Sequence, residues 1–263
     1  MKLTFYKYQG TGNDFVILDN RDLIFPKNNT KLIKFICDRR FGVGADGLML
    51  LENDNSTDFK MVYYNADGNE SSMCGNGGRC LVAFARKMEI IQETTTFIAV
   101  DGIHHAKITN ENLVSLQMID VQSIQVQSGY VFLNTGSPHH VQEVQELKEL
   151  DVKKEGAKIR YSDLYGKEGS NVNFVIQKGE NDFAIRTYER GVEDETLSCG
   201  TGATAVALAM FHLGKATSDR IGIEVQGGQL QITFEKDINK YKNIHLIGPA
   251  QFVFKGEIDF DEE

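Results

Sequence analysis

This chain of 263 residues has no stretch of about 18 apolar residues, the length that a helix needs to cross a bilayer. Its first residues, Met1 to Lys7, contain no long apolar run of the kind that a secretory signal requires. We therefore expect a cytoplasmic protein with no membrane partner. Only 3 prolines and no extended Gly/Ser tract occur, so ordinary structure rather than a flexible tether joins any two domains.

Basic residues are also in short supply. Lys and Arg number 28 against 37 Asp and Glu, which gives a formal net charge of −9. A surface of this sign repels phosphate, so we expect no nucleic-acid partner and no anionic membrane surface as the main partner. The hydrophobic content of 41% and the length are enough for an ordinary folded protein with two compact domains.

The 4 cysteines form no Cys-x-x-Cys pair and no cluster with histidine at zinc spacing, so we expect no metal site. In a reducing compartment all of them are free thiols. Cys37 lies on the apolar face of a helix that is expected to begin near Thr30, and Cys80 faces apolar neighbours. Both are expected to pack in a core.

Cys74 and Cys199 differ from these two because each opens a Cys-Gly-x-Gly motif, one in each half of the chain. The glycines let the backbone turn tightly and leave the first amides of the following helix uncovered. We expect these helices over residues 80–87 and 203–213. A thiol at a helix start lies in a positive field that favours the thiolate. The sequence thus predicts two reactive thiols, each beside free backbone amides.

Similar patterns surround both motifs, which indicates an internal duplication. Strand-like runs that end at Asn65 and Glu189 precede the two cysteines, so these polar residues hold matching places. After each helix come two alternating runs joined by a tight turn, at Asp101-Gly102 and at Gly227-Gly228. Both helices are apolar nearly all round and must therefore be enclosed by other structure.

These patterns predict an α+β fold of two pseudo-symmetric domains, each a curved, mostly antiparallel sheet or barrel around a central helix, with the active site in the interdomain cleft. The N-terminal domain is expected over residues 1–117 and carries Cys74. The C-terminal domain is expected over residues 118–249 and carries Cys199. The final strand, within residues 250–263, is expected to return to the first domain.

Two thiols and two sets of amides suit the removal of a proton from a carbon next to a carboxylate. One thiolate takes the proton, and amides at the helix starts stabilise the charge that develops on the carboxylate. Two further polar residues stand in nearby loops. The neutral form of His139 can accept a thiol proton, and Glu189 is followed by Arg190.

Other function classes fit less well. Gly-rich stretches at residues 10–15 and 42–47 resemble phosphate loops, but neither completes G-x-G-x-x-G before a helix or contains a Gly-Lys-Ser/Thr ending. A redox pair of thiols has no need of duplicated amides. A clamp that only binds an amino acid has no need of two nucleophile-type residues, because hydrogen-bond donors would be enough.

Several stretches taken together resemble the diaminopimelate epimerases, nearly end to end. The cysteine motif alone is also found in cofactor-independent racemases of proline and hydroxyproline. A racemase or epimerase of these amino acids is therefore the alternative hypothesis. The signatures around Asn13 and Glu189 favour the diaminopimelate branch. The stretches are Gly10-Thr11-Gly12-Asn13-Asp14-Phe15, Asn65-Ala66-Asp67-Gly68, Cys74-Gly75-Asn76-Gly77, Ser137-Pro138-His139, Tyr188-Glu189-Arg190-Gly191 and Cys199-Gly200-Thr201-Gly202.

The resemblance implies interconversion of LL- and meso-2,6-diaminopimelate, on the route to lysine and peptidoglycan. It also implies a homodimer that uses no cofactor, neither pyridoxal phosphate nor a metal ion. It implies that Cys74 and Cys199 flank the α-carbon, one as thiolate and the other as thiol, and that His139 and Glu189 tune them. The residues that it assigns to substrate binding are Asn13, Asn65, Gly75, Asn76, Ser137, Asn171, Glu189, Arg190, Gly200 and Thr201.

Two positions depart from the pattern of some family members. Ser137 stands where many have Asn, and Gly47 stands where some have Gln. The hydroxyl of Ser137 can still form a hydrogen bond, so it remains in the predicted binding set. Gly47 offers only its backbone and is left out of that set.

Overall fold

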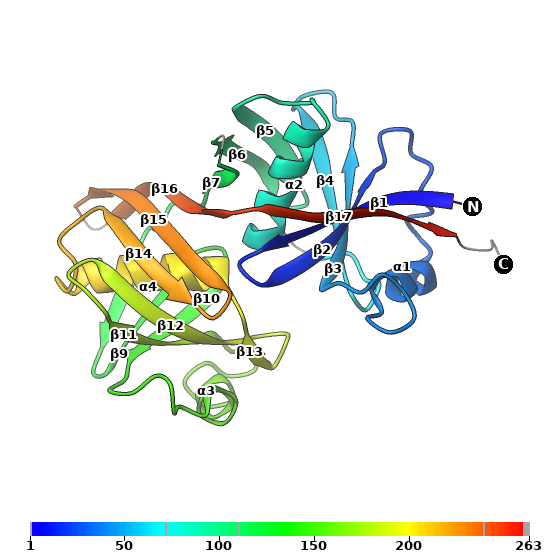
Figure 1. The fold of residues 1–263 in the computed structure, drawn as a ribbon. Helices are drawn as coiled ribbons and strands as arrows, with labels where there is room; N and C mark the ends of the chain where they lie inside the picture. Colours follow the sequence, from blue (N-terminus) through cyan, green and yellow to red (C-terminus); the bar gives the residue numbers. More distant parts are fainter. Residues whose placement is uncertain (1, 72, 110, 239, 260–263) are drawn as a thin grey trace. The chain divides into compact units, whose positions relative to one another are not determined.

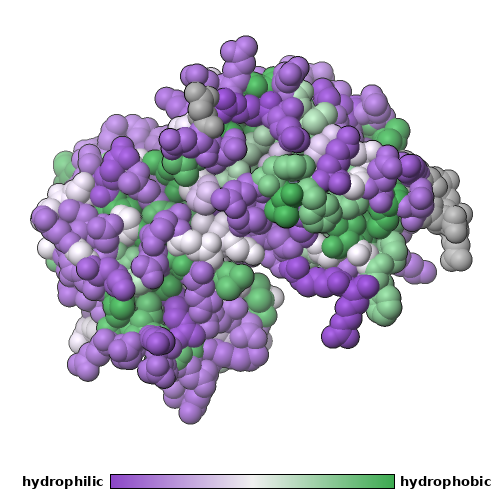
Figure 2. All heavy atoms as spheres, in the orientation of Figure 1, coloured by the Kyte–Doolittle hydropathy of each residue, from purple (hydrophilic) through white to green (hydrophobic). Residues whose placement is uncertain are grey.

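The computed structural model describes residues 2–71, 73–109, 111–238 and 240–259 of the chain. The chain divides into two compact units. Unit 1 comprises Met1–Leu116 together with Pro249–Glu263, and unit 2 comprises Gln117–Gly248. Among the described helices, none has the length and apolar character needed to span a membrane. The face drawn in Figure 2 is covered largely by hydrophilic side chains.

Unit 1 is built on one mostly antiparallel sheet, and β17 lies beside β1 in it (Figure 1). Only the β2–β3 and β4–β5 pairs are parallel among its described strands. The strand order is β17 (Gln251–Asp259), β1 (Lys2–Gly10), β2 (Asn13–Asp19), β3 (Gly47–Glu52), β4 (Phe59–Asn65), β5 (Thr94–Ala99), β6 (Gly102–Ile108) and β7 (Leu113–Gln117).

Two helices accompany this sheet, α1 (Thr30–Cys37) and α2 (Gly75–Lys87). Asn29 caps α1, because its side chain accepts a hydrogen bond from the backbone N–H of Leu32. The helix α2 contacts β1, β2, β3, β6 and β17. Its residues from Asn76 to Ala85 are all buried, as expected for a helix enclosed by its own sheet.

Unit 2 contains the helices α3 (Val152–Arg160) and α4 (Gly200–His212) and a second mixed sheet. Here β10–β11 and β12–β14 are the parallel pairs among the described strands, and β13 (Asp194–Thr196) also pairs with β12. The strand order is β8 (Ile124–Gln127), β9 (Tyr130–Asn134), β10 (Pro138–Glu143), β11 (Asn171–Gln177), β12 (Asp182–Glu189), β14 (Arg220–Val225), β15 (Gly228–Asp237) and β16 (Lys240–Pro249).

The two units repeat one topology. The sequence β1-β2-α1-β3-β4-α2-β5-β6-β7 in unit 1 corresponds to β9-β10-α3-β11-β12-α4-β14-β15-β16 in unit 2, and the parallel pairs fall at the same places. In unit 1 the strand β17 pairs with β1, as β8 pairs with β9 in unit 2. The predicted α+β fold with pseudo-symmetric, mostly antiparallel sheets around central helices is confirmed within each unit.

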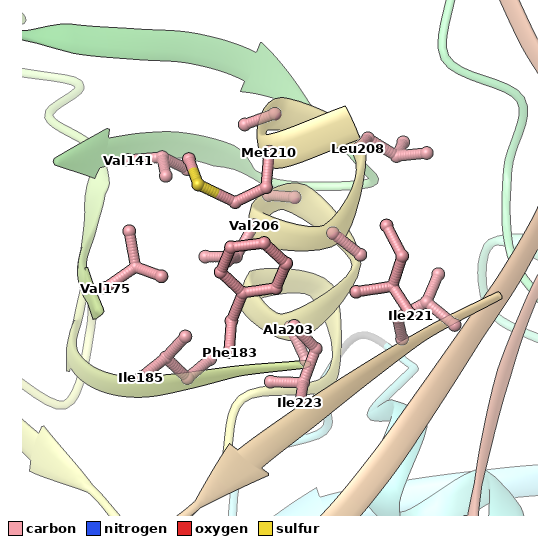
Figure 3. Packing of buried hydrophobic residues seen from close by; sticks show 14 of the residues in the cluster. Val141, Val175, Phe183, Ile185, Ala203, Val206, Leu208, Met210, Ile221 and Ile223 are labelled. Carbon is pink, nitrogen blue, oxygen red and sulfur yellow. The ribbon is translucent and has the colours of Figure 1, made fainter. Parts of the chain in front are cut away.

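The helix α4 shows why an apolar helix is enclosed. It contacts β9 to β12, β14 and β15, and Val206 and Leu208 are both fully buried. Gly214 follows its last turn with φ +70°, a conformation that glycine adopts without strain, and so ends the helix. The strand residues that surround α4 in Figure 3 are Val141, Val175, Phe183, Ile185, Ile221 and Ile223.

The two cysteines that were expected to pack do so. Cys37 belongs to the core beneath α1, and Cys80 is fully buried on α2. Burial raises the pKa of each thiol to about 12, which leaves both protonated near neutral pH. Neither is therefore a reactive thiol.

Truncation of the α4 core is expected to destabilise the protein. Leu208→Ala should lower the free energy of unfolding by about 2 to 5 kcal/mol, because it removes a buried side chain and leaves a cavity. Denaturant unfolding followed by circular dichroism measures this change. Ile238→Ala, at a side chain that is 83% exposed, is the control and should alter stability by less than about 0.5 kcal/mol. Equal losses in the two variants would contradict the enclosed-helix description.

Candidate active site

Each motif cysteine is the residue that starts a buried helix. Cys74 is the N-cap of α2 with φ −108° and ψ 123°, and Cys199 is the N-cap of α4 with φ −122° and ψ 110°. Neither side chain forms the capping hydrogen bond that Ser or Asp would form at this position. The amides of the first turn are thus not occupied by the cysteine, and the helix dipole places positive potential at each sulfur.

Both helices begin earlier than predicted, because they include the motif glycines. The expected reason for these glycines was a tight turn, yet neither Gly77 nor Gly202 has a positive φ. Their role is close packing instead. A Cβ at Gly77 would lie 1.8 Å from the terminal methyl of Met49 on β3, and a Cβ at Gly202 would lie 2.4 Å from Oδ1 of Asn173 on β11. Each glycine therefore lets a strand side chain reach the helix start.

Unit 1 places a buried cation beneath its thiol. Arg79 of α2 is fully buried, donates to the carbonyl of Gly75 (3.3 Å) and to the hydroxyl of Thr11 (3.1 Å), and forms no ion pair with the described residues. Burial lowers the pKa of Arg79 to about 10, which leaves it charged at neutral pH. In unit 2 the matching residue is the neutral Thr204, which donates to the carbonyl of Gly200 (2.9 Å). The guanidinium therefore adds positive potential beside Cys74 alone.

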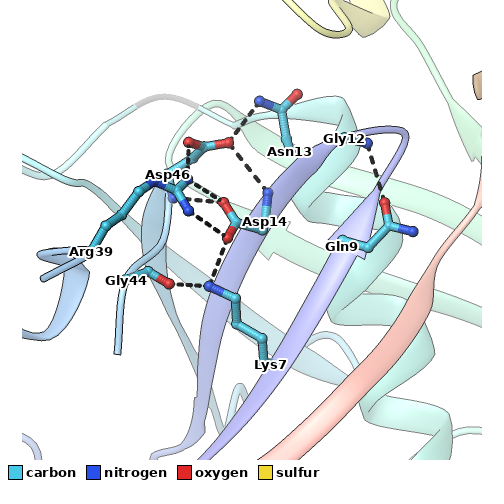
Figure 4. Close-up of polar contacts among 8 residues, drawn as sticks. All are labelled: Lys7, Gln9, Gly12, Asn13, Asp14, Arg39, Gly44 and Asp46. Atoms are coloured by element: carbon cyan, nitrogen blue, oxygen red, sulfur yellow. Dashed lines mark hydrogen bonds and ion pairs between the residues drawn. The ribbon is translucent and has the colours of Figure 1, made fainter. Parts of the chain in front are cut away.

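Asn13 is fixed by a network of charges at the start of β2 (Figure 4). Its Nδ2 donates to Oδ2 of Asp46 (3.0 Å), and Arg39 bridges Asp46 (2.8 Å) and Asp14 (2.6 Å). Lys7 forms an ion pair with Asp14 at 2.8 Å. Arg39 and Lys7 hold the pKa of Asp14 below its usual range even though burial opposes them. The side chain of Asn13 is thereby held in one orientation.

The same network reaches the cysteine motif. Asn76, the second residue of α2, donates from Nδ2 to Oδ1 of Asn13 at 2.6 Å. The predicted binding residues Asn13, Gly75 and Asn76 thus lie together next to Cys74. Asn65 is exposed at the end of β4, where its backbone forms the turn that closes on Asn69.

Gly47, the first residue of β3, has a structural reason of its own. A Cβ there would lie 2.5 Å from both the ring of Tyr63 and the carbonyl oxygen of Tyr64. A larger residue such as Gln would collide with backbone, which cannot move away as the end of a side chain can. Glycine at position 47, where some family members have Gln, is therefore the residue that leaves room for the ring of Tyr63.

Unit 2 surrounds its thiol with hydrogen bonds rather than with a cation. Nε2 of the fully buried His139 lies 3.0 Å from the hydroxyl of Thr201, which lies 3.4 Å from the sulfur of Cys199. The predicted residues His139, Thr201 and Cys199 are thus brought together. The Thr201 hydroxyl links the imidazole to the sulfur, whereas the sequence alone suggested proton transfer from the thiol to the imidazole.

The remaining predicted residues of unit 2 form a second group. The amide of Asn171 donates to the hydroxyl of Ser137 (2.8 Å) and to the carbonyl of Pro138 (3.1 Å), and its oxygen accepts from the backbone N–H of Arg190 (2.8 Å). Asn171 therefore fixes the loop that presents Ser137 and Arg190. Glu189 accepts from the hydroxyl of Thr196 at 2.9 Å, in the strand pair β12–β13.

His139 is neutral across the physiological range. Burial, helped by the nearby charge of Arg190, lowers the pKa of His139 from 6.5 to about 3. If the Asn173 amide turned its oxygen toward the ring, that oxygen would accept a hydrogen bond from Nδ1–H and raise the pKa of His139. The carbonyl of His140 excludes that orientation, because it must accept a hydrogen bond from the Asn173 amide (3.0 Å).

Sequence reasoning missed Arg79, Asn173 and Thr187. All three are buried, and they lie in an apolar helix or in strands whose pattern resembles that of a core. The signal available was a polar residue at a core position, since buried polar groups need partners. Arg79 and Asn173 have partners far away in the chain, at Thr11 and at His139 and His140, which no local pattern identifies.

The family is decided by comparison with known proteins. The sequence pattern of the diaminopimelate epimerases matches residues 5–124 and 131–253. The diaminopimelate epimerase of Flavobacterium psychrophilum is 65% identical over 258 residues, which are 98% of this chain and 100% of the relative. This chain belongs to the diaminopimelate epimerase family. The diaminopimelate epimerase of Chlorobaculum tepidum is 42% identical over 257 residues, covering 95% of this chain and 98% of that protein.

Solved structures share the fold of this diaminopimelate epimerase family member. A Bacillus anthracis phenazine biosynthesis protein of the PhzF family matches with a TM-score of 0.75 and 15% identity, covering 99% of this chain and 100% of that chain. A hydroxyproline epimerase from Agrobacterium vitis matches with a TM-score of 0.70 and 13% identity, covering 99% and 93%. At these identities the likeness concerns the fold alone.

Arg79 is expected to make Cys74 more reactive. Arg79→Met should slow the alkylation of Cys74 by iodoacetamide at pH 7 by about tenfold, because loss of a nearby positive charge disfavours the thiolate. Mass spectrometry of the labelled peptides measures the rate. Arg79→Lys keeps the charge and is the matched control, and Cys199 in the same sample is an internal reference. Equal slowing in both variants would mean that shape rather than charge matters.

His139 is expected to make stability depend on pH. Below pH 6.5 the unfolded chain binds a proton at His139 that the folded protein does not bind until about pH 3, so stability falls as pH falls through this window. The contribution is about 1.4 kcal/mol per pH unit. His139→Gln should reduce the slope of unfolding free energy against pH between 6 and 4, measured with urea. His105→Gln, at an exposed histidine of β6, controls for the substitution, and an unchanged slope in His139→Gln would contradict the buried neutral state.

Proposed function

We propose that this protein interconverts LL- and meso-2,6-diaminopimelate by moving one proton off and one proton onto the α-carbon, in the synthesis of lysine and of peptidoglycan precursors. The observation that carries the proposal is the pair of helix-start cysteines, Cys74 and Cys199, one on each of two units with the same topology. Membership of the diaminopimelate epimerase family supplies the substrate.

The chemistry follows from the properties of a helix start. A thiolate at Cys74 or Cys199 removes the α-proton and becomes a thiol, and the electron pair moves onto the substrate carboxylate. Backbone amides of Gly75, Asn76, Gly200 and Thr201 donate to the carboxylate oxygens where this charge develops. The other cysteine, as a thiol, then gives its proton to the carbon and becomes the thiolate.

Inversion requires the two sulfurs to lie on opposite faces of the α-carbon. We therefore place the substrate in a cleft that the two units close, with one thiol contributed by each unit. This proposal is supported by the shared topology of the two units, because each of them places one cysteine at the start of a buried helix. Closure also excludes water, which strengthens the interactions around a weakly acidic carbon. In the reverse direction the two cysteines exchange roles.

The polar residues around each thiol have two roles in this proposal: most bind the substrate, and two adjust the reactivity of the sulfurs. Asn13 is fixed by the charge network of Figure 4, and Asn76 donates a hydrogen bond to it; both bind substrate on the Cys74 side together with Asn65. Ser137, Asn171, Glu189 and Arg190 bind it on the Cys199 side, where the Asn171 amide fixes the loop. His139 and Glu189 additionally tune the two thiols. We further propose a cytoplasmic homodimer that needs neither pyridoxal phosphate nor a metal ion.

A racemase of proline or hydroxyproline is the second candidate. The hydroxyproline epimerase with the same fold favours it only at the level of architecture, because its sequence is 13% identical. Relatives at 65% and 42% identity are diaminopimelate epimerases. A panel of diaminopimelate, proline and hydroxyproline decides the matter, and we expect turnover of diaminopimelate alone.

Solvent isotope incorporation tests the reaction directly. LL-diaminopimelate incubated with the enzyme in D₂O should gain one deuterium at the inverted α-carbon as meso product forms, which mass spectrometry and NMR detect. The deuterium reaches the carbon from the donating thiol, because S–H protons exchange with D₂O between turnovers. Inversion without deuterium in the product, or no inversion, would refute the two-thiol mechanism.

Replacement of either motif cysteine should stop inversion. Cys74→Ser and Cys199→Ser are each expected to lower kcat by at least about a thousandfold, since a hydroxyl is a far weaker acid than a thiol. Cys37→Ala, at a buried thiol with its pKa raised to about 12, controls for loss of a cysteine and should retain activity. Oxidation without reductant should inactivate the wild type reversibly. A normal rate of inversion in either Ser variant would contradict the two-thiol mechanism.

A further inference from the structure

Asn173 holds a buried position beneath Cys199 that the proposed function leaves unused. It lies on β11, is fully buried, and faces Thr187 of β12 and Val141 of β10 in the strand register. Gly202 of the cysteine motif is a glycine because any Cβ there would collide with the Asn173 side chain. The polar side chain is thus built into the helix start that carries the thiol.

The partners of Asn173 fix which way its amide points. Its nitrogen lies 3.0 Å from the carbonyl oxygen of His140, which can only accept, so the NH₂ group must face this carbonyl. The amide oxygen then faces the hydroxyl of Thr187, which donates to it at 3.0 Å. Both polar ends of the side chain are satisfied in this orientation alone.

The second hydrogen of that NH₂ group determines the tautomer of His139. The Asn173 nitrogen lies 3.1 Å from Nδ1 of His139, so this ring nitrogen must accept and carries no proton. A neutral imidazole then has its proton on Nε2, which lies 3.0 Å from the Thr201 hydroxyl. The imidazole therefore donates to the oxygen of Thr201.

The Thr201 hydroxyl is in turn directed at the sulfur. Its oxygen already accepts from His139, so its own proton is available for the Cys199 sulfur at 3.4 Å. A donor of this kind stabilises a thiolate, because hydrogen bonds to a charged form favour that form. When Cys199 becomes a thiol, the hydroxyl can rotate and accept from it with its second lone pair.

We propose that Asn173 is a positioning residue for the reaction: it locks His139 in the Nε2–H tautomer, so that Thr201 presents a hydrogen-bond donor to the thiolate of Cys199. The tautomer lock stands on the structure alone, and its catalytic consequence rests on the proposed function. Among the described residues, the Cys74 half shows no equivalent hydrogen-bond chain. Met49 holds the equivalent place on β3 and lies against Gly77, so that thiol is served by Arg79 instead.

Asn173→Asp tests the lock with a change of almost no volume. A carboxylate presents only acceptors, so it should place a proton on Nδ1 of His139, and the Nε2–H tautomer should give way to the Nδ1–H tautomer or to the imidazolium. Long-range ¹H–¹⁵N NMR of uniformly labelled protein distinguishes the two tautomers, with His139→Gln used to assign the signal. We expect Nε2–H in the wild type and a protonated Nδ1 in Asn173→Asp. A protonated Nδ1 in the wild type, or an unchanged tautomer in the variant, would overturn the proposal.

Asn173→Met keeps the test open if the aspartate variant does not fold, because it copies the packing of the first unit and removes the donor. We expect both tautomers of His139 to be populated in this variant. Met49→Leu, at the equivalent position of unit 1, is the matched control and should leave the tautomer of His139 as in the wild type. A single Nε2–H tautomer in Asn173→Met would show that Asn173 is not what selects it.

Rate measurements test the consequence for the thiol. In both Asn173 variants the alkylation of Cys199 at pH 7 should slow by about tenfold to a hundredfold, as expected for loss of a hydrogen bond to a charged group, with Cys74 unchanged. The kcat for diaminopimelate should fall by a similar factor with little change in KM. Equal slowing at both cysteines, or a change in KM alone, would indicate a general structural effect and overturn the positioning role.

The two levels of the proposal fail in different ways. If the wild type does not invert diaminopimelate, the proposed function fails, while NMR and alkylation still decide the lock. If the wild type inverts diaminopimelate but the tautomer and the Cys199 rate do not respond to Asn173, the proposed function stands and the inference about Asn173 fails.

Discussion

The enclosure of an apolar helix by its own sheet is the constraint on which both half-sites depend. Because nearly every residue of the first turns of α2 and α4 is buried, neither helix can shift or rotate without breaking a core. The residue that precedes each helix is therefore held at a fixed place, and the first-turn amides point along the helix axis toward it. A cysteine at that place gains both a defined position and a positive field, and it needs no further loop to hold it.

In the proposed reaction, one topology provides two different ways of stabilising a thiolate. Beneath Cys74 the helix carries a buried guanidinium without an ion-pair partner among the described residues, and β3 supplies the apolar Met49. Beneath Cys199 the helix carries a neutral threonine, and β11 supplies Asn173 with its hydrogen bonds. A two-thiol enzyme needs both sulfurs to be able to exist as thiolates. A buried guanidinium and a chain of neutral hydrogen bonds can both stabilise a thiolate, but burying the charge costs more free energy than burying the neutral groups.

Much of this could be predicted from the sequence, because the information was local. The duplication, the α+β class and the helices after Cys74 and Cys199 follow from motif spacing and from apolar periodicity. The role of the motif glycines could not be predicted, since the contact of Gly202 with Asn173 depends on how a strand packs on a helix. The burial of Arg79 could not be predicted for the same reason. Whether a charged residue of an apolar helix is buried depends on how the sheet surrounds that helix.

The discontinuity of unit 1 has a consequence for how the protein is made. Residues 117–248 form unit 2 without a break, whereas unit 1 needs β17 to pair with β1, and these strands come from the two ends of the chain. During synthesis, unit 2 can complete its sheet while β1 still has an unpaired edge. Because β17 follows all of unit 2 in the chain, its pairing with β1 and its contacts with α2, the helix that carries Cys74, cannot form until unit 2 has been synthesised.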